Sequence, residues 1–286
     1  MNPDFPSVAI LGPGLLGGSL ALALRQRQPG CRIALWARRE SAAEEVRAID
    51  GMADLASSDL AAVVRDADAV IFCVPIGAMS GLAETIAPLL KPTALVTDVG
   101  SVKTPVVEAL APVFQGRARF IGSHPMAGSE QSGLAAARPG LFEGATCILT
   151  PHAGVEPTAQ QAATRLWEAV GCRVVCMEPE VHDRSIGLVS HLPHLLAAAL
   201  VDFVGQEERD AVRFCGNGFR DTTRIAAGPA AMWTEILLTN GTILQEQLDR
   251  FIAHLQNVSR SFSSPEEMNK LLVRAKAERD RLPRAT

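Results

Sequence analysis

Short apolar runs alternate with amphipathic segments along the first part of the chain. Runs rich in valine, isoleucine and leucine predict buried strands, and they lie at residues 8–11, 32–36, 68–75, 93–97, 118–121, 145–150 and 172–177. Between them, helical patterns occupy segments such as residues 20–27 and 78–90. Strands that alternate with helices predict an α/β fold with a parallel, doubly wound sheet of the Rossmann type.

The pattern changes to long helical periods near residue 180. Residues 182–205 are rich in alanine and leucine, and residues 229–257 repeat apolar side chains at helical spacing. A last helix is expected after Ser264, which begins the capping box Ser264-Pro265-Glu266-Glu267. We therefore predict a Rossmann-type dinucleotide-binding domain over residues 1–179 and an all-α domain over residues 180–286. Helices this apolar predict an interface as well as a core, so a homodimer through the helical domain is expected.

A glycine-rich loop follows the first predicted strand. Residues 12–18 read GPGLLGG, which is the G-x-G-x-x-G pattern with a strand before it and a helix after it. Gly12 is expected to allow the tight turn, Gly14 to let backbone N–H groups approach a pyrophosphate, and Gly17 to let helix and strand pack closely. The residues assigned to a nicotinamide dinucleotide are Gly12, Gly14, Leu15, Leu16, Gly17, Val74 and Pro75. The alternative is a glycine-rich turn without a ligand.

The end of the second predicted strand bears on the choice between NADP and NAD. A site for NAD has an acidic residue here, because a carboxylate bonds the ribose 2′-hydroxyl. The sequence has Ala37, Arg38 and Arg39 instead, and two guanidinium groups after a small residue favour a 2′-phosphate. We therefore predict NADP as the preferred cofactor. The alternative is NAD, with Glu40 at the ribose and both arginines solvated.

Composition and charge argue against several other classes of function. The net charge is −4 with no basic tract, so nucleic acid and anionic membranes are not expected partners. The six cysteines show neither zinc-finger spacing nor a disulfide framework, which favours a reducing cytoplasm and no metal site. The first residues lack the basic segment and apolar core of a signal peptide. No apolar run approaches the ~18 residues of a membrane span.

Polar clusters stand out in the otherwise apolar background. In FIGSHPMAGSEQSG, residues 120–133, His124 is expected in a polar loop just after a strand. Open α/β sheets bind ligands at such loops, and histidine titrates near neutral pH. The other clusters are GSVK at residues 100–103, HD at 182–183 with SHLPH at 190–194, and FRDTTR at 219–224. Taken singly, each also has a structural explanation, such as a core histidine, a helix-start charge or a surface ion pair.

Together, these motifs resemble those of the prephenate and arogenate dehydrogenase family. DVGSVK, GSHPMAGSE, HD followed by SHLPH, and FRDTTRIA followed by MWTEIL stand in family order within residues 7–257. The resemblance implies an oxidoreductase of tyrosine biosynthesis that needs no metal. Its substrate is a cyclohexadiene with a 4-hydroxyl group, a ring carboxylate and a pyruvyl or alanyl side chain. The substrate loses hydride to the nicotinamide and then carbon dioxide.

The resemblance also implies roles for single residues. His124 is the base that takes the hydroxyl proton, Ser101 hydrogen-bonds near both that histidine and the nicotinamide, and Arg224 binds a substrate carboxylate. The other residues implied to lie at the substrate are His194, His191, Asp183, Ser129, Glu130 and Trp233.

The sequence leaves the substrate side chain open. An arginine-lined NADP site resembles the arogenate-using branch, so arogenate is the preferred substrate, with an NAD-dependent prephenate dehydrogenase as the alternative. A hydroxyacid dehydrogenase of similar layout is a more remote alternative, because those similar enzymes use a second-domain lysine and residues 179–260 contain none. A non-catalytic NADP-sensing module is the other remote alternative.

Overall fold

The first domain is built on a six-stranded parallel sheet with the order β3-β2-β1-β4-β5-β6. The structure is a computed structural model that describes residues 5–129 and 131–282. The strand order changes direction at β1, as in doubly wound folds that bind a ligand at this point. The strands are β1 (Ser7–Leu11), β2 (Arg32–Trp36), β3 (Leu55–Ser57), β4 (Ala69–Phe72), β5 (Leu95–Asp98) and β6 (Arg119–Phe120).

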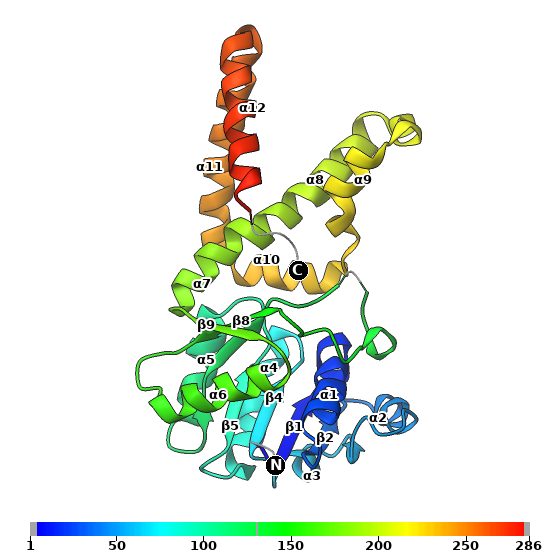
Figure 1. Ribbon diagram of the computed structural model, residues 1–286, viewed down its shortest axis with the longest axis vertical. Helices are drawn as coiled ribbons and strands as arrows, with labels where there is room; N and C mark the ends of the chain where they lie inside the picture. Colours follow the sequence, from blue (N-terminus) through cyan, green and yellow to red (C-terminus); the bar gives the residue numbers. More distant parts are fainter. Residues whose placement is uncertain (1–4, 130, 283–286) are drawn as a thin grey trace.

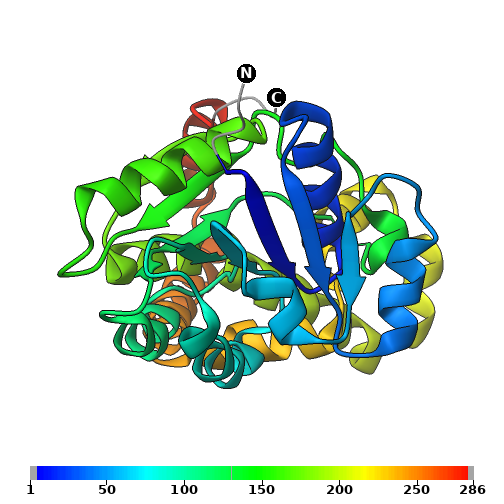
Figure 2. The same cartoon turned by 90° about the horizontal axis from the view of Figure 1, so that it is seen from below.

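Helices cover both faces of this sheet (Figure 2). Side chains alternate along a strand, so Val8 and Ile10 of β1 face one core and Leu11 faces the other. The first core is closed by α1 (Leu15–Arg27) and α6 (Pro157–Ala169), and the second by α4 (Ile76–Ile86) and α5 (Thr104–Phe114). The helices α2 (Glu40–Arg47) and α3 (Leu60–Val64) complete this domain. The predicted doubly wound sheet is confirmed.

The strands after β6 differ from the prediction, because they form a second sheet. In this sheet β7 (Gly122–Pro125) runs antiparallel to β8 (Thr146–Thr150), and β9 (Arg173–Cys176) runs parallel to β8. His124 therefore lies within a strand and not in the loop that the sequence predicted. Here the Ser123 N–H donates to a side chain, Oδ1 of Asp98 at 3.1 Å, and not to the backbone of β5, and the strand pairs with β8.

The second domain is helical, as predicted. A continuous helical segment contains α7 (Pro179–Ile186), a π-helical turn η3 (Gly187–His191) and α8 (Leu192–Glu207). It is followed by α9 (Asn217–Thr223), the 3₁₀ turn η5 (Arg224–Ala227), α10 (Ala230–Thr239), α11 (Gly241–Arg260) and α12 (Pro265–Asp280). The single helix predicted over residues 229–257 is therefore two helices that meet at Asn240. The predicted start of the last helix is confirmed, because the Glu267 N–H donates to the Ser264 hydroxyl at 3.3 Å.

The helical domain extends as two arms away from the sheet, one containing α8 and α9 and the other α11 and α12 (Figure 1). Large apolar side chains are exposed on both arms, including Phe203 at 61% and Phe262 at 79%. Exposed apolar side chains gathered on extended helices are typical of a surface that another chain covers.

One helical segment, Pro179–Glu207, is long and apolar enough to cross a membrane by length and composition, with a mean hydropathy of 1.5. This differs from the prediction that no such segment exists. One such helix is weak evidence of a membrane span. Its first half contains His182, Asp183 and His191, which are buried polar side chains, and the Asp183 carboxylate bonds the start of α5. These contacts are those of a domain core.

Candidate active site

The glycine loop between β1 and α1 has the geometry that the sequence predicted. Gly12 has φ +114°, and a Cβ atom there would lie 2.4 Å from the carbonyl oxygen of Cys73. A Cβ atom on Gly17 would lie 1.9 Å from the carbonyl oxygen of Gly12. Only glycine fits either position. Gly14, at the N-cap of α1, has open space where a side chain would be, so the backbone is accessible to a pyrophosphate.

Arg38 and Arg39 border a hollow of about 290 Å³ beside this loop. Both side chains are exposed, and neither forms an ion pair within the part of the chain that the structure describes. The other lining residues are Pro13, Gly14, Ala37, Ala42, Glu45, Gly133 and Leu134. The hollow therefore brings two cations and one acid, Glu45, to the end of β2, where an adenosine ribose binds in folds of this kind.

Glu40, the residue that would bind the ribose in an NAD site, has other partners. Its carboxylate accepts hydrogen bonds from Arg47 at 2.7 Å and from the Ser58 hydroxyl at 2.6 Å. These two bonds lower the pKa of Glu40. Both carboxylate oxygens are thus used within the protein, which weakens the alternative in which Glu40 selects NAD.

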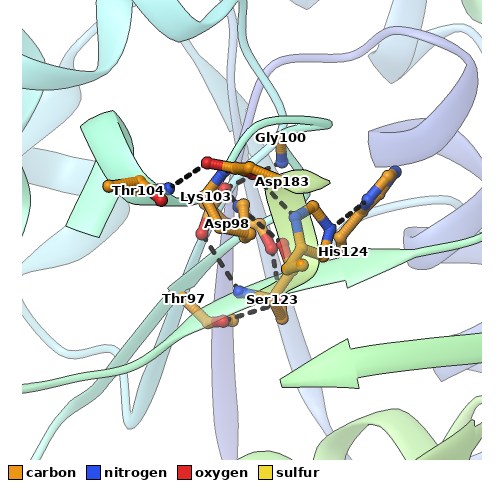
Figure 3. A network of polar contacts seen from close by, with 9 residues as sticks. Thr97, Asp98, Gly100, Lys103, Thr104, Ser123, His124 and Asp183 are labelled. Carbon is orange, nitrogen blue, oxygen red and sulfur yellow. Dashed lines mark hydrogen bonds and ion pairs between the residues drawn. The ribbon is translucent and has the colours of Figure 1, made fainter. Parts of the chain in front are cut away.

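A chain of three hydrogen-bonded side chains joins β7 to α7 (Figure 3). Nδ1 of His124 lies 2.8 Å from Nε2 of His182, and Nδ1 of His182 lies 2.8 Å from Oδ1 of Asp183. Asp183 also accepts hydrogen bonds from the backbone N–H groups of Lys103 and Thr104, at 2.7 and 2.8 Å. Both of its oxygens are therefore occupied, and Asp183 holds other residues in position. Its implied place at the substrate stays a prediction.

Burial and hydrogen bonds determine the protonation states of His124, His182 and Asp183. It lowers the pKa of His124 well below 6.5, and nearby His182 and Lys103 lower that pKa further. Burial also lowers the pKa of His182 despite the hydrogen bond to Asp183. Burial acts to raise the pKa of Asp183, but hydrogen bonds from His182 and from the backbone outweigh it and lower the pKa. At neutral pH the arrangement is therefore a carboxylate and two neutral imidazoles.

The carboxylate fixes where the imidazole protons lie. A carboxylate only accepts, so His182 must carry its proton on Nδ1 and present a lone pair at Nε2. His124 must then donate from Nδ1 to that lone pair. Nε2 of His124 is left without a proton and can act as a general base.

A buried ion pair lies beside the hydrogen-bonded side chains of His124, His182 and Asp183. The Lys103 ammonium and the Asp98 carboxylate are both 0% exposed and bond each other directly. Lys103 Nζ also donates to the carbonyl oxygen of Ser123 at 2.8 Å, and Asp98 accepts from the Gly100 N–H at 2.8 Å. The pair therefore ties the turn that carries Ser101 to the strand that carries His124.

Two other predicted site residues of the helical domain, His191 and His194, pack against Trp233. The His194 ring stacks on Trp233 with centroids 3.5 Å apart and an interplanar angle of 11°, and His191 meets the same ring edge-on at 6.4 Å. His191 and His194 are buried, whereas Arg224, at the start of η5, is exposed. The backbone of Ser101 is near enough to His191 to act on the pKa of its ring.

The loop after β7 does not join this cluster through any described hydrogen bond. The Ser129 hydroxyl accepts from the Gln131 N–H at 3.1 Å, which closes a local turn, and Glu130 lies outside the described residues. The role implied for both residues stays a prediction.

Carboxylates of the helical domain cap two helices of the Rossmann domain. Glu235 of α10 accepts from the N–H groups of Ile76 and Gly77, at 3.2 and 2.6 Å, at the start of α4. Asp183 does the same for α5. Neither helix has a side-chain cap at its own N-cap residue. These contacts hold the two domains together beside Val74 and Pro75.

Several of these residues had no role in the prediction from sequence. His182 stands next to Asp183, and this adjacency of a base and an acid was the signal that could have found it. Lys103 is a charge beside apolar residues, a weaker signal for a buried ion pair. Glu235 lies within the MWTEIL motif but was given no role, and Asn240 lies in an ordinary helical pattern with no local signal. In the described ranges, no group of three or more histidines, cysteines or acids could hold a metal ion.

Comparison with known proteins assigns both domains to one family. Residues 20–176 match the model described as the nucleotide-binding domain of prephenate dehydrogenase, and residues 178–275 match its dimerization domain. A cyclohexadienyl dehydrogenase of Zymomonas mobilis is 35% identical over 264 residues, which cover 91% of this chain and 89% of that protein.

Two solved structures are similar over nearly the whole chain. Prephenate dehydrogenase of Aquifex aeolicus, in complex with hydroxyphenyl propionate and NAD+, is 33% identical with a TM-score of 0.89, covering 98% of this chain and 97% of that one. Arogenate dehydrogenase of Synechocystis is 31% identical with a TM-score of 0.83, covering 96% and 99%.

Proposed function

Because the chain belongs to the prephenate dehydrogenase family, we propose that it oxidises and decarboxylates arogenate to tyrosine and transfers hydride to NADP. Prephenate, which would give 4-hydroxyphenylpyruvate, is the alternative substrate, and NAD is the alternative cofactor. The observation that carries the proposal is the chain of hydrogen bonds from Asp183 through His182 to His124.

In this proposal His124 is the base for the 4-hydroxyl group. The support is its buried, neutral imidazole with the lone pair on Nε2. When bound, the nicotinamide accepts hydride from the carbon that bears the hydroxyl group. As His124 takes the hydroxyl proton, that oxygen becomes a carbonyl. The ring carboxylate then leaves as carbon dioxide, and its electron pair passes through the ring to the oxygen, which recovers a proton as a phenol. Aromatisation favours the products, so the residues supply position and a base.

Ser101 and Arg224 complete the proposed site. Ser101 orients the base and the nicotinamide, which the position of its turn between the Asp98–Lys103 pair and His191 supports. Arg224 binds a substrate carboxylate, for which a bidentate guanidinium is suited. His191, His194 and Trp233 face the substrate from the helical domain, a role consistent with their close packing on one another.

The preference for NADP is supported by the two arginines at the end of β2 and by the partners of Glu40. The Aquifex relative was solved with NAD+, so the family fold alone does not favour one cofactor. The preference for arogenate follows from the same arginines, since an arginine-lined NADP site resembles the arogenate-using branch.

We also propose that the chain works as a homodimer in the cytoplasm, with no nucleic-acid or membrane partner. The match to a dimerization domain and the exposed apolar side chains of both arms support the dimer.

Steady-state kinetics with two substrates and two cofactors test these proposals together. Arogenate or prephenate is mixed with NADP or NAD, and the absorbance of the reduced cofactor gives kcat/KM. We expect the highest value for arogenate with NADP. The Arg38→Asp variant should lower kcat/KM with NADP relative to NAD by about tenfold or more, because a charge-assisted bond to phosphate is replaced by repulsion.

Other outcomes reject separate parts of the proposal. A higher kcat/KM with prephenate rejects the substrate preference, and an unchanged NADP/NAD ratio in Arg38→Asp rejects the cofactor argument. Binding of NADP without turnover of either substrate would favour the sensing module, and oxidation of a simple hydroxyacid alone would favour the other dehydrogenase class.

A further inference from the structure

Asn240 lies where α10 meets α11, and its side chain contacts two groups at the proposed active site. It is 4% exposed. Its Nδ2 atom lies 3.1 Å from the backbone carbonyl oxygen of Asp183 and 3.1 Å from Nδ1 of His191. No sequence motif pointed to this residue.

The carbonyl group fixes the orientation of the amide. A backbone carbonyl only accepts hydrogen bonds, so the atom facing Asp183 must be the amide nitrogen and not its oxygen. The second hydrogen of the same NH₂ group then points to Nδ1 of His191. That ring nitrogen must present a lone pair, and the proton of a neutral His191 must lie on Nε2.

His191 is neutral at physiological pH. It is 0% exposed, and burial lowers its pKa from 6.5 to about 4. Its Nε2 atom is buried, and the Ser101 backbone beside the ring raises the pKa of His191 as a hydrogen-bond acceptor does. The ring also meets Trp233 edge-on, a residue that the proposed function assigns to the site together with Ser101.

His191 and His182 carry their protons on opposite ring nitrogens. At His182 a carboxylate accepts the Nδ1 proton, so Nε2 of His182 carries a lone pair and accepts from Nδ1 of His124. Nε2 of His124 is then unprotonated. At His191 an amide donates to Nδ1, which leaves an N–H group at Nε2. Asp183 takes part in both arrangements, through its side chain in the first and its backbone carbonyl in the second.

We propose that Asn240 is a positioning residue that fixes His191 as the Nε2–H tautomer, so that the site holds a hydrogen-bond donor at His191 beside the acceptor at His124. The inference rests on the proposed function, because the donor serves to bind an oxygen of the cyclohexadiene, its carboxylate or its hydroxyl. A buried N–H group gains from such an acceptor, because it has already lost its contact with water.

The test reads the tautomer directly, without a substrate. The ¹⁵N shifts of the histidine rings distinguish protonated from unprotonated nitrogens, and the chain has only six histidines to assign. In the wild-type protein we expect His191 to be protonated on Nε2. In Asn240→Asp, which has the same shape but cannot donate, the proton of His191 should move to Nδ1 or the ring should become doubly protonated near neutral pH.

Kinetics measure the consequence for the reaction. Asn240→Asp should lower kcat/KM by about tenfold to a hundredfold, the usual cost of one hydrogen bond to a charged group, and should move the acidic limb of the pH profile to higher pH. The control is Gln245→Leu. It removes an amide of α11 that donates to Oδ1 of Asp249 at 2.9 Å and forms no described hydrogen bond with a histidine. It should leave the tautomer and the pH profile unchanged.

The possible results test this inference and the proposed function separately. A wild-type His191 protonated on Nδ1 overturns the inference, even if Asn240→Asp fails to fold. An unchanged tautomer in Asn240→Asp overturns it as well. If the expected tautomers are found but neither cyclohexadiene is oxidised, the proposed function fails while the role of Asn240 in fixing His191 stands.

Discussion

The imidazole of His124 is buried, and its protonation depends on two buried neighbours, His182 and Lys103. His182 determines which nitrogen carries the proton, and Lys103 helps to keep the ring neutral. These effects act through contacts of a few ångströms between residues distant in sequence. Sequence motifs identified His124 and Asp183, but the link between them through His182 depends on the packing of α7 against β7.

Replacing His124 tests the base. We expect His124→Asn to lower kcat on the order of 10²-fold or more with little change in KM, because the proton acceptor is lost while binding contacts remain. Steady-state kinetics at pH 7 measure this, with the same substitution at exposed His254 as the control. A near-normal kcat in His124→Asn would show that another group is the base.

Buried His191 makes the protein sensitive to acid. Its pKa in the folded state is about 4, below the 6.5 of the unfolded chain, so the unfolded state binds the proton more tightly. The free energy of unfolding is therefore greatest above pH 6.5 and falls as the pH drops toward 4, by about 3 kcal/mol for this residue. Urea denaturation of wild type and His191→Gln across this range checks the sign. A difference between the two proteins that does not vary with pH would contradict it.

At the scale of elements, the central strands β1, β2, β4 and β5 could be predicted from the sequence because they are continuous apolar runs, whereas the short edge strand β3, Leu-Ala-Ser, was missed. The second sheet could not be predicted. β7 contains only Gly-Ser-His-Pro, which has no apolar periodicity, and its departure from β5 depends on the Asp98 carboxylate. The division of residues 229–257 into α10 and α11 was missed for a similar reason, since apolar spacing continues across Asn240.

The position of the π-helical turn η3 also depends on packing between distant segments. A Cβ atom on Gly187 would lie 2.5 Å from Oε1 of Gln247, so α11 approaches this turn closely. We expect Gly187→Ala to lower the free energy of unfolding by about 1–3 kcal/mol and to lower kcat, because the turn carries His191.

The matched control for this substitution is Gly81→Ala in α4. Gly81 is exposed, and a Cβ atom added there would have no neighbour within 4 Å among the described residues. Alanine should therefore raise stability by about 0.5–1 kcal/mol through helix propensity alone. Chemical denaturation measures both variants. Equal effects at the two positions would argue against close packing at η3.

At the scale of the whole molecule, the arms present apolar surface that the chain itself does not cover. We expect Phe203→Asp on α8 to weaken or abolish a dimer, because a carboxylate would be buried at the interface. Sedimentation velocity at several protein concentrations measures this. Ile49→Asp, at an exposed apolar position of the Rossmann domain, is the control and should leave the oligomeric state unchanged. A monomeric wild-type protein would contradict the proposed dimer.

The capping carboxylates also determine where an anion can bind at the edge of the sheet. Each of the strands β1 to β5 is followed by a helix whose positive N-terminal end lies at this edge. Asp59 caps α3, Glu235 caps α4 and Asp183 caps α5. In the described part of the chain, only α1 and α2 of this set have no such side-chain cap. These two helix ends adjoin the glycine loop and the arginine-lined hollow. Under the proposed function, they are the helix ends at this edge nearest to the pyrophosphate and to the 2′-phosphate of NADP.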